Sequence, residues 1–82
     1  MSDKIIVYSV VWCPDCKRAR KFLDDHGIIY EAFDVDRNPE AAEYVKQVNH
    51  GNRSVPTIIF PDGAILVEPS NAQLAERLGI SL

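Results

Sequence analysis

Two cysteines separated by two residues are the part of this chain best suited to chemistry. Cys13 and Cys16 are the only cysteines among the 82 residues. They lie where an apolar run, residues 5–11, gives way to a charged segment, residues 17–25. A thiol pair at this spacing can exchange disulfides, bind a metal or close a disulfide bond. The remaining sequence must decide among these uses.

A structural zinc site is the first alternative for the two thiols. Zinc in a closed site takes four ligands. The chain has one Cys-x-x-Cys motif, and His26 and His50 do not follow the spacing of a zinc finger. We therefore expect no metal at the cysteines.

Composition limits the possible partners and compartment. At 46% hydrophobic and 26% charged residues, residues 1–82 are expected to form a single globular domain. The formal charge of -3 counts against nucleic acid, which needs a basic patch. No secretory signal or membrane-length apolar run is apparent, so we expect a cytoplasmic protein that does not enter membranes. The cations at positions 17, 18, 20 and 21 are interpreted as a solvated helix face.

The elements that must position the thiols follow from local patterns. Residues 4–9 are short, apolar and β-branched, as in a buried strand. Pro14 suits the first position of a helix, which places Cys13 at or near the N-cap. Apolar residues continue at helical spacing to Gly27, which is expected to end the helix.

The rest of the chain predicts two further helices and three further strands. Residues 28–34 read as a second strand, parallel to the first, and Asn38-Pro39 begins a helix that runs to about Asn49. Residues 58–60 and 65–67 read as a hairpin around Asp62-Gly63. Ser70 and Gln73 form a capping box for a last helix that ends at Gly79. The predicted order is β-α-β-α-β-β-α, with a mixed sheet and helices on both faces.

This order, with Cys-x-x-Cys after the first strand and Val55-Pro56 before the third, resembles the thioredoxin-like fold in its glutaredoxin form. That is an α/β fold with a four-stranded mixed sheet and three helices. Residues 48–57, together with Phe60, Asp62-Gly63 and Pro69-Ser70, resemble more narrowly the mycoredoxins. These are glutaredoxin-like reductases that use the thiol mycothiol in place of glutathione.

The resemblance implies a thiol–disulfide oxidoreductase that removes a low-molecular-weight thiol from protein mixed disulfides. Mycothiol or glutathione would be a co-substrate, no cofactor would be tightly bound, and the protein would act as a monomer. At a helix N-terminus, unpaired N–H groups and the helix dipole stabilise negative sulfur, so we expect Cys13 to be the nucleophile. Cys16, one turn inside the helix, would be more buried and suited to resolving a mixed disulfide.

Two departures from ordinary glutaredoxins count against glutathione. Those proteins usually carry a lysine three residues before the first cysteine, where this chain has Val10. They also carry Gly-Gly and acidic residues ahead of the last helix, where this chain reads Val67-Glu68-Pro69-Ser70-Asn71. The residues between the cysteines, Pro14-Asp15, differ as well from the Pro-Tyr or Gly-Tyr that is common in the family.

Several residues around the cysteines are candidates for binding the thiol. The resemblance predicts a cis bond at Val55-Pro56, which would let the Val55 backbone pair with an extended thiol peptide. Trp12 is interpreted as a surface residue at the rim, and Arg53 either pairs with a carboxylate of the thiol or is solvated. Ser70 and Asn71 begin a helix and offer an anion-friendly site.

Asp15 is the unusual member of the motif. Its carboxylate would oppose a thiolate on Cys13, and this electrostatic effect would distinguish it from the tyrosine of relatives. Alternatively it is a solvent-facing first-turn residue that stabilises the helix.

Two other functions stay open at this point. One is a dithiol redoxin reduced by thioredoxin reductase, which would serve ribonucleotide reductase or a peroxiredoxin. The other is an iron–sulfur carrier, with a cluster bridging two chains, as occurs in some relatives of the glutaredoxins.

Overall fold

The computed structural model describes residues 4–81, so the expected domain of residues 1–82 extends beyond them at both ends. Seven elements follow one another: β1 (Ile5–Ser9), α1 (Pro14–Asp25), β2 (Tyr30–Asp34), α2 (Pro39–Val48), β3 (Thr57–Ile59), β4 (Ile65–Val67) and α3 (Asn71–Leu78). This is the predicted order, and the thioredoxin-like α/β architecture is confirmed.

The four strands form one mixed sheet in the order β2-β1-β3-β4. Strand β1 pairs in parallel with β2 and antiparallel with β3, and β3 pairs antiparallel with β4 across the hairpin. Because β1 and β2 are parallel neighbours, their carboxyl ends meet at the same edge of the sheet. The loops that leave these two strands therefore lie close together.

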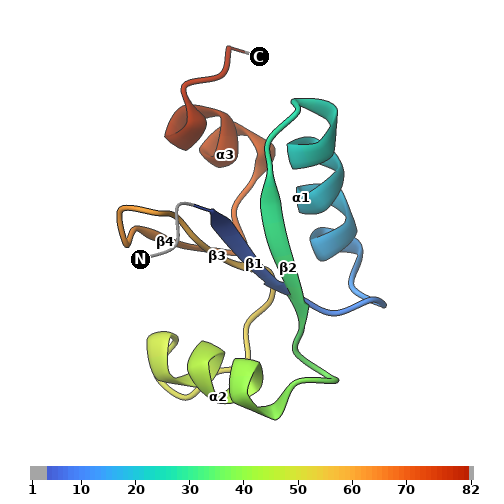
Figure 1. Ribbon diagram of the computed structural model, residues 1–82, viewed down its shortest axis with the longest axis vertical. Helices are drawn as coiled ribbons and strands as arrows, with labels where there is room; N and C mark the ends of the chain where they lie inside the picture. Colours follow the sequence, from blue (N-terminus) through green and yellow to red (C-terminus); the bar gives the residue numbers. More distant parts are fainter. Residues whose placement is uncertain (1–3, 82) are drawn as a thin grey trace.

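The helices cover both faces of the sheet, as predicted (Figure 1). Helices α1 and α3 lie on one face, where a large hydrophobic core joins them to β1 and β3. Helix α2 lies on the opposite face. A second, smaller cluster consists of Val10, Cys16, Val35 and Val45. One of the two cysteines is therefore part of the packed interior.

The second strand begins at Tyr30, so its predicted start at Ile28 is wrong. The Ile28 N–H donates to the Leu23 carbonyl oxygen at 2.9 Å and closes the end of α1. Gly27 takes the left-handed conformation that this closure needs, with φ of 67°. Ile29 is left 79% exposed.

Two other strands differ from their predicted bounds by one residue. Strand β1 begins at Ile5, and β3 spans Thr57–Ile59 in place of residues 58–60. The Phe60 N–H instead donates to the Ala64 carbonyl oxygen at 2.8 Å and so belongs to the hairpin turn. None of the helices found between residues 4 and 81 is long and apolar enough to cross a membrane.

Candidate active site

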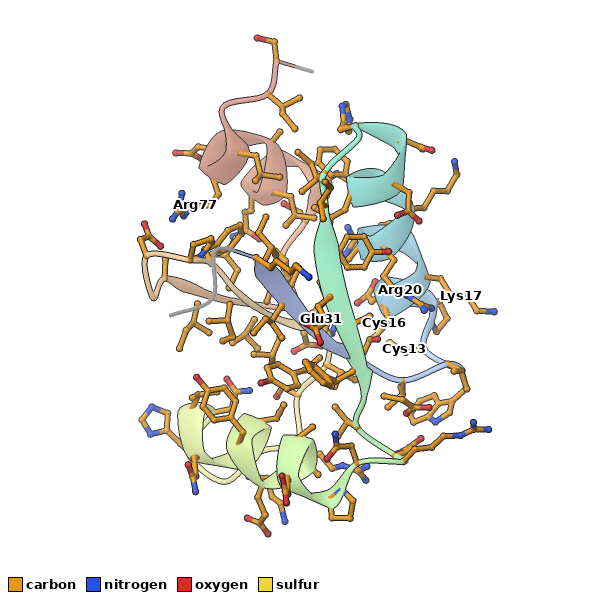
Figure 2. The ribbon with its side chains drawn as sticks, in the orientation of Figure 1. Cys13, Cys16, Lys17, Arg20, Glu31 and Arg77 are labelled. Atoms are coloured by element: carbon orange, nitrogen blue, oxygen red, sulfur yellow. The ribbon has the colours of Figure 1, made fainter. Side chains whose placement is uncertain are left out.

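Cys13 is the N-cap of α1, as predicted, with extended backbone angles of φ -88° and ψ 117°. Pro14 follows at the first helical position, where its missing N–H costs no hydrogen bond. The Cys16 N–H points at the Cys13 Sγ at 3.4 Å. Figure 2 shows both cysteines at the start of this helix. The backbone thus presents an N–H group to the sulfur of Cys13, an arrangement that favours negative charge there.

Cys16 has a different environment, one turn further along α1. Its side chain is fully buried, whereas Cys13 is partly exposed, and both are free thiols. Burial is the main reason that the pKa of Cys16 is raised to about 12; a backbone hydrogen bond with Val10 acts against it, and Cys13 adds to it. Cys16 therefore holds its proton at neutral pH, and Cys13 is the sulfur that a substrate can reach.

The loop before β3 faces the second cluster. The Val55–Pro56 peptide bond is cis, as the resemblance predicted. Val55 and Cys13 both pack against the cluster that contains Cys16. Thr57 anchors the end of this loop, because its hydroxyl donates to the Ser54 carbonyl oxygen at 2.7 Å and accepts from Asn49 Nδ2 at 3.0 Å.

One side of the rim around Cys13 is built by a carboxylate that the sequence did not single out. Asp36 Oδ2 accepts from the Trp12 indole N–H at 2.7 Å, and Asp36 Oδ1 accepts from Arg53 Nη2 at 2.7 Å. Trp12 is 69% exposed, in agreement with the predicted surface position. Arg53 is neither free nor merely solvated, because it is held by Asp36.

The strand arrangement could have indicated Asp36. This residue follows the carboxyl end of β2, and Trp12 follows the carboxyl end of β1. Parallel neighbours bring these two ends to one edge of the sheet.

Arg18 links α1 to the start of α3, which corrects its interpretation as part of a solvated face. Arg18 Nη1 donates to Asn71 Oδ1 at 2.6 Å, and Nη2 donates to the Pro69 carbonyl oxygen at 2.8 Å. The Asp15 carboxylate lies 3.7 Å from Arg18 Nε and is 58% exposed. The charge of Asp15 is therefore partly offset by a neighbour one turn away.

The polar atoms at the start of α3 already have partners within the protein. Ser70 Oγ accepts from the Gln73 N–H at 3.1 Å, and the Ser70 N–H donates to Gln73 Oε1 at 2.8 Å. This is the predicted capping box. Asn71 Oδ1 also accepts a hydrogen bond from Arg18, so the guanidinium of Arg18 supplies the positive charge beside the start of α3.

The comparisons with known proteins agree with this geometry. The sequence model of the Glutaredoxin family matches residues 5–65. The chain belongs to the glutaredoxin family. It is 40% identical to Mycoredoxin 1 of Corynebacterium glutamicum over 76 residues, which cover 93% of this chain and 94% of that protein.

Two further relatives extend the comparison. The Glutaredoxin-like protein NrdH of Lactococcus lactis is 35% identical over 60 residues, or 73% of this chain and 81% of that protein. The crystal structure of the glutaredoxin from Methanosarcina mazei superposes with a TM-score of 0.80 at 33% identity, covering 94% of this chain and 79% of that one. This glutaredoxin-family chain is therefore a thiol–disulfide oxidoreductase.

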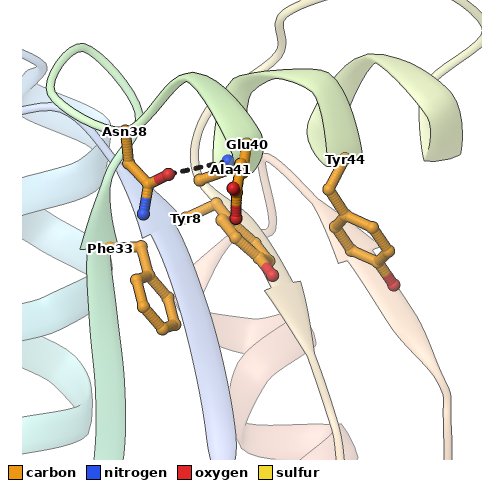
Figure 3. A pocket seen from close by; sticks show the side chains of 6 residues that line it. All are labelled: Tyr8, Phe33, Asn38, Glu40, Ala41 and Tyr44. Atoms are coloured by element: carbon orange, nitrogen blue, oxygen red, sulfur yellow. Dashed lines mark hydrogen bonds between the residues drawn. The ribbon is translucent and has the colours of Figure 1, made fainter.

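The glutaredoxin-family chain also has a cleft beside α2 (Figure 3). Its volume is about 200 Å³, and its walls are Tyr8, Phe33, Asn38, Glu40, Ala41 and Tyr44. Burial raises the pKa of Tyr8, and nearby Tyr44 and Glu31 raise it further. None of the predicted site residues lines this cleft.

Metal ligands are not gathered anywhere in the part of the chain that the structure describes. Among residues 4–81, no group of three or more histidine, cysteine or acidic side chains could hold a metal ion.

Proposed function

We propose that this enzyme removes a low-molecular-weight thiol from protein mixed disulfides through Cys13. The Cys13 thiolate would attack the sulfur of the small thiol, and the target protein would leave as a thiolate that takes up a proton. A second small thiol would then attack that same sulfur, releasing an oxidised small-thiol disulfide and restoring Cys13. The observation that carries this proposal is the contrast between accessible Cys13 at the helix N-terminus and buried, protonated Cys16.

Cys16 would offer a second route of release. Its Sγ can attack the Cys13 sulfur of the mixed disulfide, which forms a Cys13–Cys16 bond and expels the small thiol. Because the pKa of Cys16 is raised to about 12, this route requires its proton to be lost as the bond forms. We therefore expect the single-thiol cycle to be sufficient for turnover.

A mycothiol-like thiol is the co-substrate that the sequence favours. Similarity to Mycoredoxin 1 supports this choice, as do Val10 and the 67–71 segment, which depart from the glutathione-binding pattern. Trp12, Arg53 and Val55 would contact the thiol on one side, and Pro14, Asp15, Ser70 and Asn71 on the other. The side chain of Pro56 is fully buried, so its part would be to orient the Val55 backbone. We place the enzyme in the cytoplasm as a monomer of one domain, without a tightly bound cofactor.

The choice of electron donor tests this function. A thiolated protein substrate would be supplied with mycothiol and its reductase, or with glutathione and glutathione reductase. We expect turnover that is lost in Cys13→Ser and survives in Cys16→Ser, which is the matched control. Activity that needs both cysteines would count against the single-thiol cycle.

A dithiol redoxin is the second candidate, favoured by the 35% identity to NrdH. In that function thioredoxin reductase would reduce the Cys13–Cys16 disulfide directly. Turnover with thioredoxin reductase alone, without any small thiol, would support this candidate and reject the first.

A further inference from the structure

Asp36 connects two side chains that flank the approach to Cys13. Each of its carboxylate oxygens has one partner, with Trp12 on Oδ2 and Arg53 on Oδ1, both at 2.7 Å. The bonds join three separate loops, since Trp12 follows β1, Asp36 follows β2 and Arg53 precedes β3. One carboxylate therefore sets the positions of an indole and a guanidinium that no local sequence feature would hold together.

This group of three lies beside the reactive sulfur. Trp12 is the residue before Cys13, and Asp36 follows Val35, which packs with Val10 and Cys16 in the second cluster. All three side chains are open to solvent, with exposed fractions of 69% for Trp12, 36% for Asp36 and 48% for Arg53. A thiol compound joined to Cys13 can therefore touch this surface.

The charges of the group determine which thiols it suits. Arg53 would ordinarily attract a carboxylate through paired hydrogen bonds. Here Asp36 already occupies one guanidinium nitrogen, so a carboxylate on the thiol must compete with it and approach a like charge. A neutral thiol rich in hydroxyl groups avoids this repulsion, because hydroxyl groups can donate to the carboxylate oxygens and carbon faces can stack on the indole.

We propose that Asp36 is a specificity-determining residue that disfavours carboxylate-bearing thiols by occupying Arg53 and fixing Trp12 beside Cys13. The proposal rests on the proposed function, in which a small thiol is bound at Cys13. Asp36 acts through its two partners and is a positioning residue.

A binding measurement tests this role without any chemistry at sulfur. Trp12 is the only tryptophan in the sequence, so its fluorescence reports directly on this surface. The probe is S-methylglutathione, which has two carboxylates and no reactive thiol. We expect Asp36→Asn to bind the probe about fivefold more tightly than the wild type, the factor expected for an exposed ion pair.

Two variants keep the test specific. Asp25→Asn makes the same chemical and charge change at an exposed ion pair with Lys21, at the far end of α1. It should bind the probe like the wild type. The double variant Asp36→Asn/Arg53→Gln should lose the gain, because the guanidinium that receives the carboxylate is gone. Equal gains in Asp25→Asn and Asp36→Asn would overturn the proposal, as would no gain in Asp36→Asn.

A kinetic measurement separates specificity from folding. With a glutathionylated protein, Asp36→Asn should lower KM about fivefold and leave kcat unchanged. With a mixed disulfide to neutral 2-mercaptoethanol, KM should not fall. A fall in KM for both substrates would contradict a selective role. If the wild type reduces neither substrate, the proposed function fails, and the fluorescence titration still decides the role of Asp36.

Discussion

The reaction centre and its rim are built in different ways. At the centre, the backbone of the first turn of α1 faces Cys13, and burial raises the pKa of Cys16. At the rim, side chains from distant parts of the chain meet, as in the bond between Trp12 and Asp36, which are 24 residues apart. In the proposed function, the chemistry and the choice of thiol would therefore depend on separable parts of the molecule.

The largest expected effect comes from the centre. Cys13→Ser should reduce turnover of mixed disulfides to the rate without enzyme, because a hydroxyl does not attack disulfides. The fold should persist, since serine is a favourable N-cap and Cys13 is partly exposed. Steady-state turnover and a thermal unfolding curve measure the two effects. Residual turnover in a folded Cys13→Ser variant would refute the role of Cys13 as nucleophile.

The environment of Cys16 predicts a dependence of stability on pH. Its pKa rises from 9.0 to about 12 on folding, so its contribution to stability is complete below pH 9 and is lost as the pH rises toward 12. Over that range the free energy of unfolding of the reduced protein should fall more steeply with pH than that of Cys16→Ala. Urea unfolding of both proteins at several pH values measures the difference.

A constant difference between wild type and Cys16→Ala across this range would show that the Cys16 thiol is not kept protonated by the fold.

The buried hydroxyl of Thr57 holds the loop before β3 in place. Thr57→Val removes the acceptor for Asn49 Nδ2 and the donor to the Ser54 carbonyl oxygen, while Thr57 is fully buried. A buried donor left without a partner costs about 1–3 kcal/mol, so unfolding should become easier by that amount. Thr57→Ser retains the hydroxyl and serves as the control. Equal losses of stability in the two variants would assign the effect to packing.

The smallest expected effect lies at the link between α1 and α3. Arg18→Gln breaks the link from α1 to Pro69 and Asn71, and its partial exposure limits the loss of stability to about 1 kcal/mol. The KM for the small thiol should change while kcat is unchanged. Lys17→Gln, an exposed neighbour of the same charge, is the control. A fall in kcat for Arg18→Gln alone would place Arg18 in the centre.

Local signals predicted the geometry around Cys13 and most of the fold. The N-cap at Cys13, the left-handed Gly27 and the capping box of Ser70 with Gln73 each depend on residues within one helical turn of one another. The predicted start of β2 was wrong because an apolar, β-branched residue suits both a strand and the closure of a helix. The Ile28 N–H donates to the Leu23 carbonyl oxygen, so Ile28 closes α1 and does not begin β2.

The rim could be predicted only in part. Trp12 and Arg53 were recognised as candidates, but the side chain that joins them was not, because the contact from Trp12 to Asp36 spans 24 residues. Arg18 was read as solvated for the same reason. An arginine on a charged helix gives no local sign that its partner lies at the start of the last helix.

Identifying which sulfur of the mixed disulfide Cys13 attacks tests the proposed function most directly. Cys16→Ser would be mixed with a protein that carries the small thiol as a mixed disulfide, and the products would be separated by intact-mass spectrometry. We predict that Cys13 gains the mass of the small thiol while the target protein is released with a free thiol. A disulfide between Cys13 and the target protein, with the small thiol released, would contradict it.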